Sequence, residues 1–144
     1  MRHFSLISIL LILSACAEPL NFIPGGTLSG NQTELPALWQ NIPETIQLET
    51  NLDDSYSVNI WGLAVGKDFY VATGEDGTTW SHNMNSDSRV VLRVGKNLYS
   101  LNAVEITESI ERESVTQAYI EKYDVDKSDS WLVKGRIYRL DRTL

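Results

Sequence analysis

After Pro43 the chain contains no proline, and most of its apolar residues alternate with polar ones. Proline has no backbone N–H to donate to a sheet, so its absence from residues 44–144 leaves that part of the chain able to form paired strands. All four prolines lie earlier, at positions 19, 24, 36 and 43. Alternation with a period of two is typical of strands that bury one face. We therefore expect a mainly β domain, preceded by a segment that is not part of a sheet interior.

The alternation predicts six strands, over residues 45–50, 57–66, 68–74, 89–95, 97–107 and 131–140. Within the second strand the apolar phase slips between Ile60 and Trp61, next to Gly62. A slip beside a glycine predicts a β-bulge or a barrel corner. The fourth and fifth strands are expected to form a hairpin with its turn at residues 95–97.

Two helices are expected, a short one within residues 78–87 and a longer one over residues 109–124. The longer helix has one face made by Val115, Ala118, Tyr119 and Lys122. Glu111 and Glu113 suit its first turn, because acids are favoured near a helix N-terminus. The expected N-cap is Thr107 or Ser109. The predicted fold class is thus α+β and mainly β, a small barrel of about six strands.

The N-terminus has the pattern of an export signal. Arg2 and His3 precede an apolar run over residues 4–13, and "LSAC" ends at Cys16. The apolar run is shorter than the roughly 20 residues that span a bilayer, so residues 1–15 are predicted to be a signal peptide. "LSAC" resembles the bacterial lipobox, which implies that Cys16 is lipid-modified and begins the mature chain. The alternative is an ordinary secreted protein with a chance cysteine. Ala17, in place of an aspartate, favours the periplasmic side of the outer membrane by the same resemblance.

The mature chain is long enough for one domain. Residues 16–34 are expected to form a lipid-anchored tether or a wrapping segment, and residues 35–144 the folded domain. Leu35, Leu38 and Trp39 are apolar enough to pack on that domain. Loss of Arg2 with the signal peptide leaves 11 basic against 19 acidic residues, a net charge of about −8. This charge argues against nucleic acid or anionic lipid headgroups as partners.

Several kinds of site are excluded by missing residues. "GKD" at 66–68 and "GKN" at 95–97 lack the rest of a phosphate-binding loop. His82 and a lipidated cysteine are too few for a usual zinc site, so no metal is expected. No serine lies in an elbow motif that would make His82 part of a catalytic triad. "DVDKSD" at 124–129 begins like a calcium loop and lacks its glycine and its final glutamate.

The order of elements resembles the flavin-binding split β-barrels, a superfamily that includes pyridoxamine phosphate oxidases and deazaflavin-dependent nitroreductases. The resemblance covers about residues 24–141, and its most recognisable segments are "PGGTLSG", "TIQLET", "SVNIWG", "NMNSDSRVVLRV" and "LYSLNAVEIT". It implies a split β-barrel of about six strands with one short and one longer helix. It also implies a dimer with FMN or a related flavin at the seam between barrels. The phosphate would lie near the connection after the third strand.

That connection supplies the candidate cofactor-binding residues, which are Thr78, Thr79, Trp80, His82 and Asn83. The threonines offer hydroxyls, and Trp80 offers a stacking surface. Flavin split barrels usually have a lysine or arginine here, whereas this chain has no fixed cation before Arg89. His82 is therefore expected either to contact a phosphate, or to lie half-exposed on a short helix and hydrogen-bond a carbonyl.

Three functions remain open. The first is a flavin-type oxidoreductase or flavin carrier. The second is a barrel that binds haem or another planar small molecule, with His82 as a ligand. The third is a cofactor-free interaction or structural lipoprotein, because a chain exported unfolded must acquire any cofactor outside the cytoplasm. A homodimer is predicted on the face of the second strand, since apolar side chains there point both ways. The alternative is that residues 35–39 cover that face.

Overall fold

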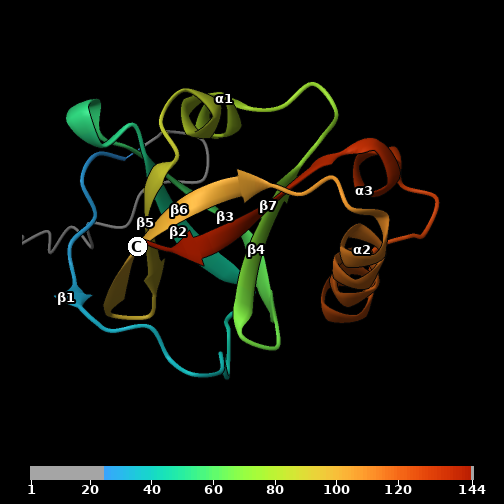
Figure 1. The fold of residues 1–144 in the computed structure, drawn as a ribbon, viewed down its shortest axis with the longest axis horizontal. Helices are drawn as coiled ribbons and strands as arrows, with labels where there is room; N and C mark the ends of the chain where they lie inside the picture. The colour runs from blue at the N-terminus through green and yellow to red at the C-terminus, as the bar shows by residue number, and fades with distance from the viewer. Residues whose placement is uncertain (1–24, 144) are drawn as a thin grey trace, which may run out of the picture.

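Six antiparallel strands close into a barrel in the computed structural model, which describes residues 25–143 (Figure 1). The barrel strands are β2 (Thr45–Thr50), β3 (Tyr56–Val65), β4 (Asp68–Thr73), β5 (Arg89–Val94), β6 (Asn97–Glu105) and β7 (Arg136–Arg142). A short seventh strand, β1 (Asn31–Gln32), lies beside β6. The helices are α1 (Thr79–Ser86), α2 (Ser109–Tyr123) and α3 (Ser130–Lys134), with a 3₁₀ turn at Leu52–Asp54. The predicted fold class, a mainly β barrel with helices, is confirmed. The predicted signal peptide and Cys16 lie outside the described residues.

The barrel closes in the order β6-β5-β2-β3-β4-β7, with β7 pairing back to β6. Each of these pairings is antiparallel, and the two-residue β1 adds to β6 in parallel. The β3–β4 and β5–β6 hairpins both turn through a Gly-Lys pair, beginning at Gly66 and Gly95. These glycines have φ of 63° and 61°, the positive φ that a type II′ turn requires at its first loop position. The two Gly-Lys pairs are therefore hairpin turns.

The predicted barrel corner lies on β3. The strand pairs with β2 as far as Trp61 and with β4 from Gly62 onward. A Cβ atom on Gly62 would lie 2.8 Å from Cγ1 of Ile46 and 2.9 Å from Cε1 of Phe69, so only glycine fits at this corner. The side chains keep their alternation through the corner. The alternation of apolar with polar residues breaks there because the outward side chains are buried as well. Leu63, for example, is packed beneath α2 and α3.

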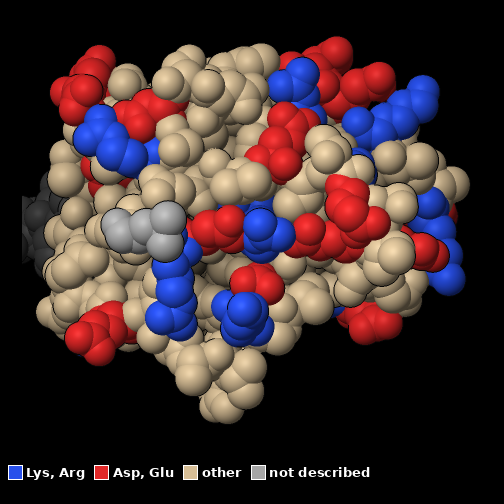
Figure 2. Space-filling view, viewed as in Figure 1, with Lys and Arg blue, Asp and Glu red and all other residues tan. Residues whose placement is uncertain are grey.

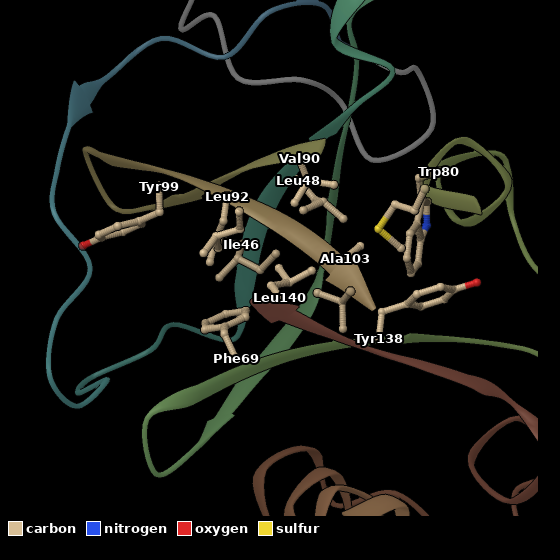
Figure 3. Close-up of a cluster of buried hydrophobic side chains, with 13 residues drawn as sticks. Ile46, Leu48, Phe69, Trp80, Val90, Leu92, Tyr99, Ala103, Tyr138 and Leu140 are labelled. Atoms are coloured by element: carbon tan, nitrogen blue, oxygen red, sulfur yellow. The ribbon is translucent and has the colours of Figure 1, made fainter. Parts of the chain in front are cut away.

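The barrel interior is a single apolar core (Figure 3). Its least exposed side chains include Leu48, Phe69, Val71, Val90, Leu92 and Leu101. One end is closed by α1, whose Trp80 points into the barrel toward Tyr138 (Figure 3). At the other end Trp39 packs edge-on against Phe69 and Tyr99, with ring centroids 5.0 and 4.9 Å apart. The interior is thus filled by side chains, and a ligand must bind outside it.

A second apolar layer lies between the barrel wall and the helices α2 and α3 (Figure 1). Val115 and Tyr119 of α2 are buried in it, as the predicted helix face requires. The predicted N-cap was wrong. The cap is Glu108, whose carboxylate accepts hydrogen bonds from the backbone N–H groups of Ile110 and Glu111 at 3.1 and 2.8 Å.

The last predicted strand was wrong in its first half. Residues 131–134 belong to the short helix α3, and β7 begins only at Arg136. The reason is packing, since Leu132 is buried against the outer face of the barrel. At Gly135 the backbone passes so close to the carbonyls of Trp131 and Thr73 that a side chain would not fit. This glycine therefore separates the helix from the strand.

The described part of the N-terminal segment wraps around the barrel (Figure 1). Gly25 pairs with Ser57, and Leu28 is buried while its N–H donates to Oε2 of Glu49 at 2.9 Å. Residues 25–34 of the predicted tether therefore contact the folded domain. Farther along, Leu35 and Trp39 pack against the barrel core, while Leu38 remains exposed.

The face on which the homodimer was predicted is largely covered within the chain itself. The apolar outer face of β3 is covered in large part by α2, which neither of the two sequence-based alternatives included. Trp61 remains 47% exposed on that face. The homodimer stays a prediction.

Candidate ligand-binding groove

The five candidate residues all lie at or on α1, which caps one end of the barrel. Thr78 is its N-cap and Thr79 its first residue, and both are exposed. The backbone N–H of Thr78 donates to Oγ of Ser81 at 2.8 Å, so this donor is already used within the helix cap. The cap fixes the start of α1 directly after the β4 connection.

The other candidates on α1 point in different directions. Trp80 is buried and packs edge-on against Tyr138, with ring centroids 6.3 Å apart. His82 is exposed, and its imidazole lies beside Gly77, where a Cβ atom would be 3.2 Å from Nε2. Asn83 donates from Nδ2 to Oγ1 of Thr50 at 3.1 Å, which ties α1 to the end of β2. These five residues therefore do not converge on a single site.

A groove next to α1 takes in two of the five. It has a volume of about 340 Å³ and is lined by Asn59, Ile60, Trp61, Ala72, Thr73, Thr78, Trp80, Tyr119 and Trp131. Its residues come from β3, β4, α2 and α3 as well as from the start of α1. Thr79, His82 and Asn83 do not line it. The volume is near the lower end of the range of roughly 300–1,000 Å³ that is typical of small-molecule sites.

Four of the nine residues that line the groove are aromatic. Trp61 stacks on Tyr123 of α2 with centroids 4.5 Å apart and an interplanar angle of 11°, so the phenol ring covers one face of its indole. Trp131 lies 6.3 Å from Trp61 and 5.8 Å from Tyr119, at angles of 57° and 87°. Such an arrangement offers both ring faces and ring edges to a planar ligand.

Trp61, Tyr119 and Trp131 line the groove and were not predicted from the sequence as binding residues. Trp61 occupies an outward position of β3, on the face that was predicted from the sequence to form a dimer interface or to be covered by residues 35–39. Tyr119 was predicted correctly on the inner face of α2, and that face gave no signal that a groove reaches it. Trp131 was assigned to a strand. The available signal was the gathering of large aromatic residues in elements that pack on one side of the barrel.

No charged side chain lines the groove within the described residues. Its polar groups are hydroxyls, an amide and the N–H groups of the tryptophan indoles, and Oγ1 of Thr73 donates to Oγ1 of Thr78 at 3.4 Å. Burial raises the pKa of the Tyr119 phenol above its ordinary value, so this hydroxyl remains protonated at neutral pH. The groove therefore suits an uncharged ring better than an anion.

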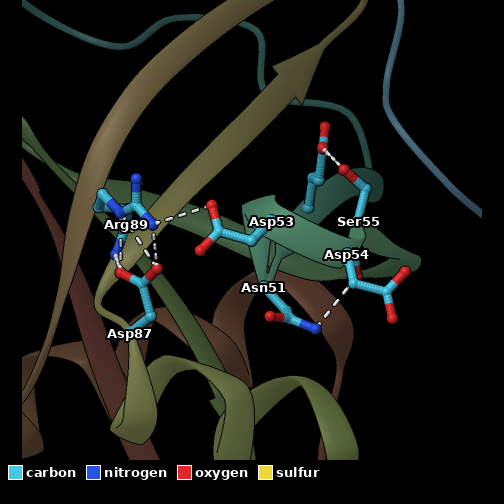
Figure 4. A network of polar contacts seen from close by, with 7 residues as sticks. Asn51, Asp53, Asp54, Ser55, Asp87 and Arg89 are labelled. Atoms are coloured by element: carbon cyan, nitrogen blue, oxygen red, sulfur yellow. Dashed lines mark hydrogen bonds and ion pairs between the residues drawn. The ribbon is translucent and has the colours of Figure 1, made fainter.

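Arg89, the first cation after the candidate residues, is engaged elsewhere (Figure 4). Its guanidinium binds Asp87 at 2.6 Å and lies 3.5 Å from Asp53. The side-chain and backbone hydrogen bonds from Arg89 hold the pKa of Asp87 below its usual range. The contact with Asp53 links the 3₁₀ turn to the start of β5, and Arg89 does not line the groove.

Over the face drawn in Figure 2, acidic and basic side chains are interspersed.

Two other hollows flank Trp39 at the opposite end of the barrel. One, of about 380 Å³, has Lys67, Asp68 and Arg142 in its lining, and the other, of about 420 Å³, has Glu121 and Lys122. Their charged linings and their single aromatic ring make them poorer sites for a planar ligand.

Within residues 25–143 no His, Cys, Asp and Glu side chains gather in a way that could hold a metal ion. The described helices are also too short or too polar to cross a bilayer.

Solved structures with a similar fold include one of a pyridoxamine 5′-phosphate oxidase and one of a FAD-binding protein. A protein of Listeria innocua described as a pyridoxamine 5′-phosphate oxidase matches with a TM-score of 0.56 and 11% identity, over 68% of this chain and 82% of that one. A FAD-binding protein of Mesorhizobium loti matches with a TM-score of 0.50 and 13% identity, over 71% and 83%. The fold is a split barrel. No protein-family model and no curated protein sequence matches the chain.

Proposed function

We propose that this protein is a lipid-anchored split barrel that binds a planar, flavin-type ring in the groove beside α1. The observation that carries the proposal is the uncharged groove lined by Trp61, Trp80, Tyr119 and Trp131. The groove adjoins the connection after β4, which is the third strand predicted from the sequence, and the resemblance to flavin split barrels puts the phosphate of the cofactor near this connection. The similarity in fold to a FAD-binding protein supports the same kind of ligand.

The residues of the groove fit the ring of a flavin and do not fit its phosphate. Trp61 and Trp131 offer apolar surface against which a planar ring packs, and Thr73, Thr78 and Tyr119 offer hydroxyls to its polar edge. A phosphate is normally held by Arg or Lys, or by free backbone N–H groups at a helix N-terminus. Here no cation lines the groove within the described residues, and the capping box of α1 uses the N–H groups of Thr78 and Ser81.

A bound flavin would supply electron transfer, and the chain's own contribution would be to hold the ring and to exclude water from one of its faces. The ring of Tyr123 stacks on Trp61 and supports it, and the Tyr123 hydroxyl is in turn bound to the carbonyls of Glu44 and Gly62 at 2.7 and 2.8 Å. The groove is thus supported by main-chain contacts of the barrel. Such support favours a site that is already formed before a ligand binds.

The visible absorbance spectrum of the full-length protein, purified from membranes in detergent, tests this function. The bands of an oxidised flavin, or binding of added riboflavin, would support the proposal. A haem band would favour the haem-binding alternative, and a protein that has no chromophore and binds no added flavin would favour a cofactor-free interaction protein.

Replacement of Trp61 locates the site. Trp61→Ala is expected to weaken binding of riboflavin at least about fivefold, equivalent to ~1 kcal/mol, because an aromatic stacking partner is lost. Quenching of flavin fluorescence measures the affinity. Leu38→Ala is the matched control, since Leu38 is also a large exposed apolar residue and lies outside the groove. Equal affinities for wild type and Trp61→Ala would remove the groove as the site.

The location of the protein is the second part of the proposal. We propose that Cys16 carries lipid and holds the barrel on the periplasmic side of the outer membrane. The support is the "LSAC" segment after an apolar run, with Ala17 following the cysteine.

A further inference from the structure

Within residues 25–143, one buried side-chain polar atom has no hydrogen-bond partner, and it is the hydroxyl oxygen of Tyr119. Tyr119 is 1% exposed, yet it lines the groove. Its ring lies edge-on to Trp131 and stacks on Tyr123, with centroids 5.8 and 5.7 Å apart. Leaving a buried hydroxyl without a partner costs free energy. A ligand with an acceptor atom that reaches this hydroxyl, by displacing the side chains that cover it, would therefore gain a hydrogen bond that the protein alone does not form.

The other tyrosine hydroxyls of this outer layer are satisfied by the protein. Tyr70 donates to Oε1 of Glu111 at 3.0 Å, and Tyr123 donates to main-chain carbonyls. Tyr119 differs from both of them in lacking a hydrogen-bond partner and in lining the groove. The difference is therefore local to the groove and is not a general feature of how α2 packs on the barrel.

The surroundings of the groove disfavour an anion. The loop between β4 and α1 carries the exposed acids Glu75 and Asp76, and the chain has a formal net charge of −7. Arg89 is held by Asp87 and Asp53. A phosphate that entered the groove would lose hydration without gaining a cationic partner.

We infer that the groove selects a planar heteroaromatic ring without a phosphate, such as that of riboflavin, and that the Tyr119 hydroxyl donates a hydrogen bond to the polar edge of that ring. This inference rests on the proposed function and makes it more specific. The carbonyl oxygens and ring nitrogens of an isoalloxazine are acceptors, which matches a hydroxyl that remains protonated. The packing of Tyr119 between Tyr123 and Trp131 fixes the direction of that donor.

Riboflavin and FMN share one ring and differ in the phosphate, so they test the selectivity directly. Titration of the full-length protein in detergent is expected to give a dissociation constant for riboflavin at least tenfold lower than that for FMN. Equal affinities, or tighter binding of FMN, would overturn the inference and leave the proposed function intact. Binding of neither compound would overturn both.

Tyr119→Phe tests the hydroxyl. The variant is expected to bind riboflavin about five- to tenfold more weakly, while its melting temperature without ligand stays the same or rises, because the lost hydroxyl had no partner in the protein. Tyr70→Phe is the matched control, because it removes a satisfied hydroxyl from the same layer. It should lower the melting temperature and keep the wild-type affinity. Unchanged affinity in Tyr119→Phe, or a drop in its melting temperature as large as that of Tyr70→Phe, would show that Tyr119 has a structural role only.

Discussion

Gly62 shows how a single residue sets the shape of this barrel. Its Cα lies where β3 changes partner from β2 to β4, and the side chains of Ile46 and Phe69 fill the space that a Cβ would need. Its N–H and its carbonyl are both bound to the hydroxyl of Tyr123. One glycine thus connects the barrel corner to the helix that covers it.

Gly62→Ala should therefore destabilise the protein by about 1–3 kcal/mol, the usual cost of adding a methyl group to a packed core. Chemical denaturation at neutral pH measures the change. Gly26→Ala is the control, because a Cβ at Gly26 meets nothing within 4 Å and should leave stability nearly unchanged. If the two variants denature at the same concentration, the corner packing is looser than described.

The candidate residues show what a local pattern can and cannot predict. The segment around Thr78 and Trp80 was proposed from the resemblance to flavin split barrels, and both residues line the groove. The direction in which each of these side chains points depends on tertiary packing, which the local sequence pattern does not reveal. Trp80 packs mainly in the barrel core, and His82 is exposed. Trp61 and Trp131 became part of the wall only because α2 and α3 fold onto β3.

At the scale of elements, strands were predicted well because period-two alternation is a direct consequence of one buried face. β2, β4 and β5 lie within a residue or so of their predicted bounds. The failures came where tertiary packing overrides the pattern. Residues 131–134 have the apolar character of a strand, and they form α3 because Leu132 fits beneath α2. The N-cap of α2 was missed because a glutamate took the role expected of threonine or serine.

That cap leads to a pH-dependent prediction for α2. The N–H groups of Glu111 and Ile110 hold the pKa of Glu108 below its unfolded value of about 4.5. The stabilising contribution is therefore fully present above pH 4.5 and is lost as the pH falls through the folded-state pKa. Glu108→Ala should lower the melting temperature by a few degrees at pH 7, and its difference from wild type should shrink toward pH 3.

Glu113→Ala removes the same charge from the exposed side of the same helix and serves as the control. It should have a smaller effect at pH 7, because no cap hydrogen bond is lost. A deficit in Glu108→Ala that is as large at pH 3 as at pH 7 would argue against the cap.

For the molecule as a whole, the wrapping of the N-terminal segment limits how far the barrel can stand from a membrane. Gly25 already pairs with Ser57 on the barrel. If Cys16 is anchored, only residues 16–24 bridge the lipid and the barrel, and nine residues span at most about 30 Å when fully extended. The proposed anchor would thus hold the barrel near the bilayer, where its ligand would have to arrive through the periplasm.

The anchor itself is tested by Cys16→Ser. Acyl chains on Cys16 would make membrane attachment effectively permanent, at about 0.8 kcal/mol for each buried CH₂ group. The variant is therefore expected to leave the outer-membrane fraction and to appear in the soluble periplasmic fraction or as unprocessed precursor. Cell fractionation with immunoblotting follows the protein, and globomycin, which blocks lipoprotein signal cleavage, should make wild-type precursor accumulate.

Ala17→Ser leaves the cysteine in place and should fractionate like wild type. Retention of Cys16→Ser in the outer membrane with normal processing would mean that another part of the chain holds it there.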